Sequence, residues 1–127
     1  MTERPAEQPT DAVAEEVVVC LPVAPGRRLG PAWGRAHTVA LATVRNGEVT
    51  GWTEEEVRWD VAHDEGGSGA HHARVVRYLR THGVRAVAAG HMGAGMEHTL
   101  GKLGVAVLLG APDDAEAAAV AAASRAS

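Results

Sequence analysis

The stretch HDEGGSGAHH, at residues 63–72, places three histidines and two acidic residues around three glycines. Imidazole nitrogen is a good ligand for Zn, Cu, Ni and Fe, so this composition indicates a transition-metal site. Two more histidines stand at the ends of apolar runs elsewhere in the chain. The candidate metal ligands are therefore His37, His63, His71, His72 and His91.

Several of these histidines also have a purely structural interpretation. His72 shares a predicted helix face with Leu79, so it is equally well explained as a packed core residue. His37 can be an edge residue at the start of a strand. His82 directly precedes a glycine and is expected at the carboxyl end of a helix, far from the other histidines. Position in the fold, rather than histidine content, decides between these interpretations.

Apolar runs separated by turn signals predict an α/β domain with the order β-β-β-α-β-α-β-α and one five-stranded mixed sheet. The last two strands and the helix between them form a parallel crossover. The predicted elements are a strand at 17–21 buried on both faces, a loop at 24–35, hairpin strands at 37–44 and 49–60 around an Asn-Gly turn, a helix from Ser68 to residue 81 or 82, a strand at 84–89, a helix at 96–103, a strand at 105–109 and an alanine-rich helix from 113.

In open α/β sheets, ligands bind beyond the carboxyl ends of the parallel strands. The loop after the first strand and the loops at 61–69 and 90–95 should meet there, and they bring the candidate histidines with them. Three arginines of the first loop and two helix N-termini would make this crevice positive. Such a crevice suits an anionic metal–sulfur cluster or an oxyanion better than a bare cation. The three arginines are Arg27, Arg28 and Arg35.

Composition excludes several other functions. The net charge is −4 and the chain has three Trp, one Tyr and no Phe, so nucleic acid is not an expected partner. The single cysteine, Cys20, rules out an internal disulfide and a zinc finger, and a buried thiol in a reducing, cytoplasmic compartment is expected. Residues 1–15 are polar and predict a disordered tail before a domain at 16–127. Neither a signal peptide nor a membrane span is expected.

Catalytic motifs fit poorly. Residues 66–69 (GGSG) lack the spacing and the lysine of a Walker A loop, although a generic anion loop remains open. Cys20 lies in an apolar strand, where a reactive thiolate is disfavoured. Ser68 is better explained as a helix cap than as a nucleophile, because no nucleophile elbow surrounds it. We therefore do not expect an enzyme.

The segments PAWGRAHTVALATVRNGEVTGW and GGSGAHHARVVRYLRTHGVRAVAAGHMGAGMEHTLGKLGVAVLLG carry a family resemblance in the order and spacing of their glycines. Together they resemble the dinitrogenase iron-molybdenum cofactor biosynthesis family over roughly residues 17–120. The resemblance implies a ribonuclease H-like fold and a small carrier or scaffold for iron–sulfur or molybdenum-containing clusters. It also implies donor and acceptor proteins of cofactor assembly as partners. The residues expected to contact the cofactor are Arg35, Gly67, Gly69, Met92 and Gly93.

The expected function is therefore a non-catalytic binding or carrier protein for a transition metal ion or a metallocluster. Two alternatives remain open at this point. A histidine-bound metal can activate water, which would make the protein a metal-dependent hydrolase with Glu65 as a base. Alternatively, the protein is an interaction module in which the histidines are incidental.

Overall fold

The computed structural model describes residues 16–30, 32–62 and 67–126, and the predicted tail at 1–15 lies outside them. The described chain forms an α/β domain, as the sequence predicts. Its strands are β2 (Glu16–Ala24), β3 (Arg28–Leu29), β4 (Thr38–Arg45), β5 (Glu48–Glu56), β6 (Val84–Ala89) and β7 (Ala106–Leu109). Its helices are α2 (Trp59–Ala62), α3 (Gly67–Thr81), α4 (Ala94–Lys102) and α5 (Ala115–Ala123).

The sheet of the described residues is mixed, with strands in the order β5-β4-β2-β6-β7. β4 runs antiparallel to both β2 and β5, whereas β6 runs parallel to β2 and β7. The sheet has six strands rather than the predicted five, because the two-residue strand β3 pairs antiparallel with the end of β2. The segment at 24–35 is therefore not entirely a loop. A two-residue strand is too short to leave an alternating pattern in the sequence.

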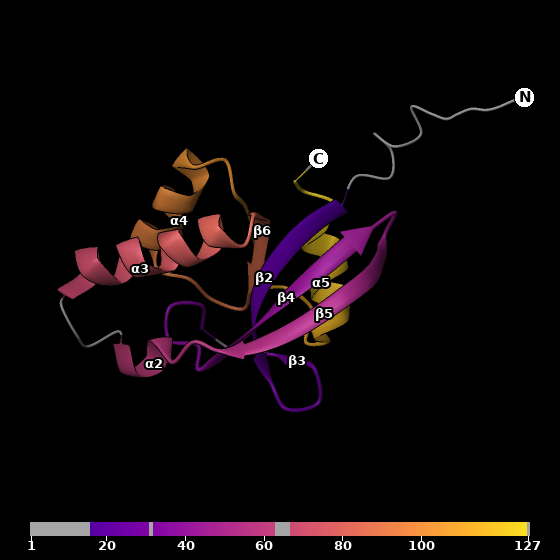
Figure 1. Ribbon diagram of the computed structural model, residues 1–127, viewed down its shortest axis with the longest axis horizontal. Coiled ribbons are helices and arrows are strands. Elements are labelled where there is room, and N and C mark those ends of the chain that lie inside the picture. The colour runs from indigo at the N-terminus through magenta and orange to yellow at the C-terminus, as the bar shows by residue number, and fades with distance from the viewer. Residues whose placement is uncertain (1–15, 31, 63–66, 127) are drawn as a thin grey trace, which may run out of the picture.

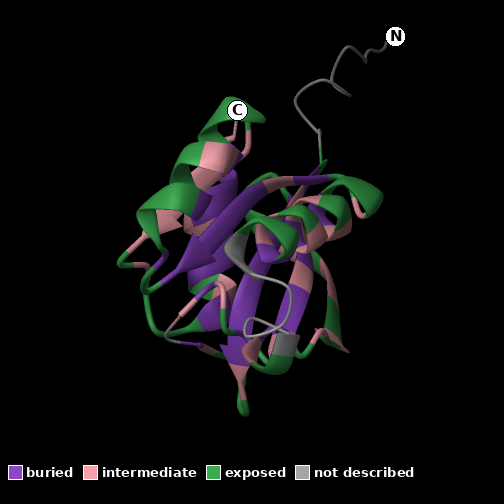
Figure 2. Ribbon diagram, turned by 90° about the vertical axis from the view of Figure 1, so that its left-hand side faces the viewer, coloured by how far each residue is buried: buried purple, intermediate pink, exposed green. Residues whose placement is uncertain are grey.

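Helices cover both faces of the sheet. Figure 1 shows α3 and α4 on one face and α5 behind the other. Small side chains of α5, including Ala118, Ala119 and Ala122, pack against the inner strands on one face. Trp33, Trp59 and Leu79 belong to the core on the opposite face. Figure 2 shows the buried central strands between these layers, which explains why the first strand lacks polar alternation.

The predicted hairpin is confirmed, with its turn at Asn46 and Gly47, where φ is 54° and 77°. Positive φ at both central residues is the signature of the turn that Asn-Gly favours. The return strand was predicted to reach residue 60, but it ends at Glu56 and α2 follows. Arg58 adopts a positive φ of 57°, which turns the chain out of the sheet. α2 is thus an additional helix before α3.

The helices otherwise follow the predicted pattern. α3 ends before Gly83, whose φ of 64° stops the helix. The side chain of Asp114 caps α5 by accepting a hydrogen bond from the Ala117 N–H at 2.9 Å. Ser68 is not the residue before α3, because the helix already begins at Gly67. Among the residues the structure describes, no helix is long and apolar enough to cross a membrane.

Candidate metallocluster site

The segment 32–37, between β3 and β4, organises the carboxyl end of the sheet through backbone contacts. Ala32 forms a parallel bridge with His91, and the Trp33 N–H donates to the His91 carbonyl at 3.0 Å. The His37 carbonyl accepts from the N–H groups of Val57 and Arg58, at 2.9 Å each. The segment therefore contacts both the end of β6 and the turn into α2. As predicted, the loops after β2 and β6 meet at this end of the sheet.

His71 fixes the same segment to α3. Its side chain is only 3% exposed, and its Nε2 lies 2.9 Å from the carbonyl oxygen of Gly34. Its Nδ1 lies 3.3 Å from Nη1 of Arg74. Because arginine only donates and the carbonyl only accepts, Nε2 carries the proton and Nδ1 is the acceptor. Both ring nitrogens are therefore already engaged.

The helix phase of the two neighbouring histidines differs from the prediction. We predicted that His72 lies in the apolar stripe, but His71 is the buried member and His72 is partly exposed. The ring of His72 instead packs beside the first turn of α4, where a Cβ on Gly95 would lie 3.3 Å from its Cε1. The two histidines thus join α3 to different parts of the fold: His71 contacts the 32–37 segment and His72 contacts α4.

His37 lies exposed between two carboxylates. Its Nε2 lies 3.0 Å from Oε2 of Glu56, and its Nδ1 lies 3.0 Å from Oδ2 of Asp60. The hydrogen bonds to Glu56 and, next, to Asp60 raise the pKa of His37 above its ordinary value of 6.5. Because the two carboxylates occupy opposite sides of the ring, this trio cannot converge on one metal ion. Its hydrogen bonds instead link the start of β4 to β5 and to α2.

His91 and the first turn of α4 form an open rim. His91 is exposed, and Gly93 caps α4 without a side chain to satisfy the first backbone N–H groups. Met92 and Met96 are 5% and 4% exposed, so both thioethers belong mainly to the core. Arg35 is exposed in the 32–37 segment. The rim therefore combines the His91 imidazole with a helix N-terminus, and Arg35 lies in the adjoining 32–37 segment.

The five candidate histidines do not form a preformed metal site in the structure as described. His63 lies outside the described residues. Among the described residues, no group of three or more His, Cys, Asp or Glu side chains is arranged to hold a metal ion. The other four histidines lie within or beside the 32–37 segment and the start of α4, but their side chains do not converge on one point. The topology placed them at one end, but their ring orientations depend on local packing.

Two other expectations about this end need correction. Arg27 does not face the crevice, because it pairs with Glu116 of α5 at 2.6 Å and its guanidinium carbon lies 4.7 Å from the Trp52 ring centre. The backbone of Arg28 forms an antiparallel β-bridge with that of Asp114, the residue that caps α5. The β3 pairing turns this part of the first loop toward the other face of the sheet. Of the three arginines, only Arg35 belongs to the 32–37 segment.

The glycines expected to contact a cofactor lie at helix starts. Gly67 is the first residue of α3, and Gly69 is exposed in its first turn. A Cβ on Gly69 or Gly93 would meet no atom within 4 Å, so neither glycine is required by packing. Their close approach to a ligand therefore remains a prediction.

Cys20 is fully buried in β2, as expected from the sequence. Burial, followed by the nearby charge of Glu55, raises the pKa of its thiol well above the ordinary value. A protonated thiol without solvent access is neither a nucleophile nor a ready metal ligand. Cys20 therefore belongs to the core and not to the candidate site.

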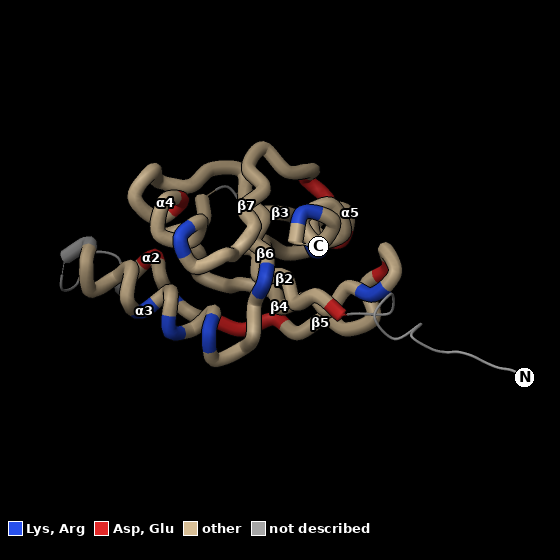
Figure 3. The backbone as a smooth tube through the Cα atoms, turned by 90° about the horizontal axis from the view of Figure 1, so that it is seen from above, with Lys and Arg blue, Asp and Glu red and all other residues tan. Residues whose placement is uncertain are grey.

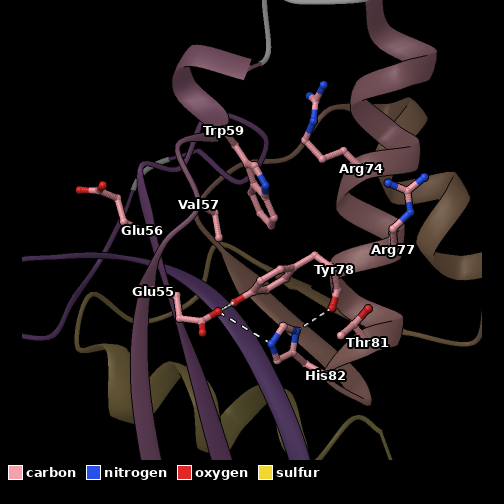
Figure 4. Close-up of a pocket in the computed structure, with 9 residues that line it drawn as sticks. All are labelled: Glu55, Glu56, Val57, Trp59, Arg74, Arg77, Tyr78, Thr81 and His82. Atoms are coloured by element: carbon pink, nitrogen blue, oxygen red, sulfur yellow. Dashed lines mark hydrogen bonds and ion pairs between the residues drawn. The ribbon is translucent and has the colours of Figure 1, made fainter.

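Sequence reasoning missed a second polar cluster between β5 and α3. The Tyr78 hydroxyl donates to Glu55, and His82 lies one helical turn beyond Tyr78 with its Nδ1 2.9 Å from the Tyr78 carbonyl. Figure 4 shows these side chains along one groove. His82 was correctly predicted at the carboxyl end of its helix. The spacing of Tyr78 and His82 is visible in the sequence, but the partner on β5 depends on tertiary structure.

A family model described as dinitrogenase iron-molybdenum cofactor matches residues 15–125. The chain belongs to this family. The match confirms the resemblance drawn from the glycine pattern and associates the chain with metallocluster biology. A solved structure titled "Crystal structure of PH0822" is similar to this chain, with a TM-score of 0.62 and 16% identity over 79% of this chain and 84% of that one. At this identity, the similarity supports the α/β fold alone. A comparison with curated proteins gives no significant match.

Proposed function

We propose that the protein binds an iron–sulfur or molybdenum-containing cluster as cargo and carries it between donor and acceptor proteins, without catalysing a reaction. The binding surface is the rim formed by the 32–37 segment, His91 and the first turn of α4. The observation that carries the proposal is the contact of Ala32 and Trp33 with His91, within a chain of this family. That contact brings the loops after β2 and β6 into one surface.

The charge of the rim supports an anionic cargo. The N-terminus of α4 presents backbone N–H groups and the positive end of the helix dipole. Arg35 adds a full positive charge in the adjacent segment. These groups repel a bare divalent cation but attract an anionic metal–sulfur cluster. His91, exposed at the same rim, is the described histidine best placed to supply a ligand nitrogen.

The remaining candidates take secondary roles in this proposal. His63 is the second proposed ligand. His71 and His37 would have to give up existing hydrogen bonds to bind a metal, and His72 would have to leave its contact with α4. We propose Arg35, Gly67, Gly69 and Gly93 as charge or backbone contacts, with Met92 beneath the rim. A single transition metal ion is the alternative cargo, for which the described residues offer no preformed site.

The test uses untagged protein purified without oxygen, because an affinity tag would add histidines. The protein is incubated with isolated iron-molybdenum cofactor, with ferrous iron plus sulfide, or with Zn²⁺ alone, and metal per chain is measured after desalting. The proposal predicts retained iron, and molybdenum where supplied, and loss of most of it in the double variant His63→Ala/His91→Ala. His98→Ala is the matched control, since His98 is exposed one turn further along α4.

Two results would contradict this function. Equal metal retention by the wild type and the double variant would remove the histidines from the site. Retention of Zn²⁺ without retention of either cluster would replace the cluster by a single ion. Transfer of the bound cluster to an apo acceptor protein is the further expectation for a carrier.

We also propose that the fold is ribonuclease H-like in shape. The order of the five long strands supports it: the first three form the antiparallel run β5-β4-β2, and β6 and β7 extend the sheet in parallel beside β2. The likeness would concern shape alone. The stretch of β2 that follows Glu16, from Val17 to Ala24, has no acidic residue of the kind that a two-metal nuclease needs in its first strand.

A further inference from the structure

A groove of about 700 Å³ lies between the end of β5 and α3, at a different place from the rim. Its size falls within the range of about 300–1,000 Å³ typical of small-molecule sites. Figure 4 shows Glu55 and Val57 along one side, with Trp59 between the walls and α3 residues along the other, while the Glu56 side chain points away from the groove. The lining residues are Glu55, Glu56, Val57, Trp59, Arg74, Arg77, Tyr78, Thr81 and His82.

One part of the groove is apolar and rigid. Trp59 is 2% exposed, and its ring meets the Tyr78 ring edge to face, with centres 5.7 Å apart and planes at 90°. Trp33 supports Trp59 from the core side, with ring centres 5.3 Å apart. Val57 completes this wall. Tyr78 and Val57, with the edge-to-face ring of Trp59 packed behind Tyr78, form a preorganised apolar surface for a flat group.

The charged side chains of the groove differ in whether they form hydrogen bonds or ion pairs. Glu55 accepts the Tyr78 hydroxyl hydrogen and lies 3.8 Å from Nε2 of His82, while Glu56 lies 3.0 Å from His37. Both carboxylates therefore have partners. Arg77, in contrast, is exposed and makes no ion pair with any described residue. In Figure 3, basic positions of α3 lie beside acidic positions of β5 along the backbone trace, and residues of both elements line the groove.

Arg74 and Arg77 stand three residues apart on α3, and both residues line the groove from the helix side. Guanidinium binds carboxylate and phosphate in a bidentate manner. The groove thus joins an apolar wall to a cationic side whose exposed member, Arg77, lacks a carboxylate partner in the described chain.

We propose that this groove binds a small organic anion, namely a planar ring joined to a carboxylate or phosphate group. The ring lies against Val57, Trp59 and Tyr78, and the oxyanion is held by Arg77 with Arg74 beside it. This site shares no lining residue with the metallocluster rim, so its test is separate from that of the proposed function.

The test is a titration of the full chain by calorimetry, with ¹H–¹⁵N NMR shifts to locate the site. Benzoate and phenyl phosphate supply both ring and anion, benzamide supplies the ring alone, and inorganic phosphate supplies the anion alone. We expect benzoate or phenyl phosphate to bind, with shifts at Arg77, Tyr78 and Thr81, and the tighter of the two identifies the preferred anion. Benzamide and inorganic phosphate should each bind about tenfold more weakly or worse.

The Arg77→Ala variant should weaken this binding by about 10- to 100-fold, because it removes a charge-assisted hydrogen bond. Arg77→Lys should recover part of the loss. Arg80→Ala is the matched control: Arg80 is an exposed arginine on α3 that does not line the groove. The proposal is overturned if neither aromatic anion binds at millimolar concentration. Benzamide binding as tightly as benzoate, or equal losses in Arg77→Ala and Arg80→Ala, would also overturn it.

Discussion

Replacing His71 by alanine should destabilise the protein strongly, because this side chain joins α3 to the 32–37 segment. The substitution removes the donor that Nε2 supplies to the Gly34 carbonyl at 2.9 Å, in a place where the side chain is 3% exposed. A buried carbonyl without a partner costs about 1–3 kcal/mol, and the vacated ring volume adds about 1–2 kcal/mol. The expected loss in the free energy of unfolding is therefore about 2–5 kcal/mol.

Urea unfolding followed by circular dichroism measures this loss. With a slope of about 2 kcal/mol per molar urea, the midpoint should fall by about 1–2.5 M while the slope stays unchanged. The His71→Gln variant tests the cause, since its amide can donate to Gly34 and should recover most of the hydrogen-bond contribution. His98→Ala, a change at an exposed histidine, should shift the midpoint little. The reasoning is refuted if His71→Ala costs less than about 0.5 kcal/mol, or if His71→Gln is no more stable than His71→Ala.

Three further outcomes follow from the structure. Since Glu56 and Asp60 raise the pKa of His37, their stabilisation is fully present below the unfolded value of 6.5 and disappears as the pH rises through the raised folded value. Urea midpoints should therefore fall across this window in the wild type more than in His37→Gln, and parallel pH profiles would exclude this role. Cys20 should react with a chromogenic disulfide reagent only at the rate of unfolding, because burial raises its pKa and blocks access; fast native-state labelling would contradict this. Gly69→Ala should stabilise α3 by about 0.5–1 kcal/mol, since a Cβ there meets no atom within 4 Å, and a destabilised variant in thermal unfolding would show that the position needs glycine for another reason.

The parts of the fold that depend on local chemistry were predictable from the sequence. Asn46 and Gly47 encode the hairpin turn because both adopt positive φ, and the buried run at 84–89 coincides with β6. The end of α3 at Gly83 has the same local origin. These features require no knowledge of distant residues.

Features that depend on distant partners were missed. β5 ends early because the carbonyls of Ala36 and His37 accept the N–H groups of residues 57–59, which start α2. β3 exists only through its pairing with the end of β2. Both contacts form between segments that the sequence pattern cannot align.

The candidate site shows the same division. His37, His71, His72 and His91 lie in or beside the 32–37 segment and the start of α4, and their shared role as metal ligands stays a prediction. The choice between His71 and His72 as the buried residue depended on the rotation of α3, because both phases of the apolar pattern fit the sequence. The groove beside β5 escaped prediction because its acidic wall and its basic wall come from different elements.

Binding of a metallocluster at the rim beside His91 and the start of α4 can be seen by anomalous diffraction at the iron edge, from crystals of the anaerobically loaded protein. We expect a strong iron peak next to His91 and the first turn of α4, and its loss in His63→Ala/His91→Ala crystals. An iron peak at the β5–α3 groove, or well-loaded crystals without a peak at the rim, would show that the cluster does not bind there.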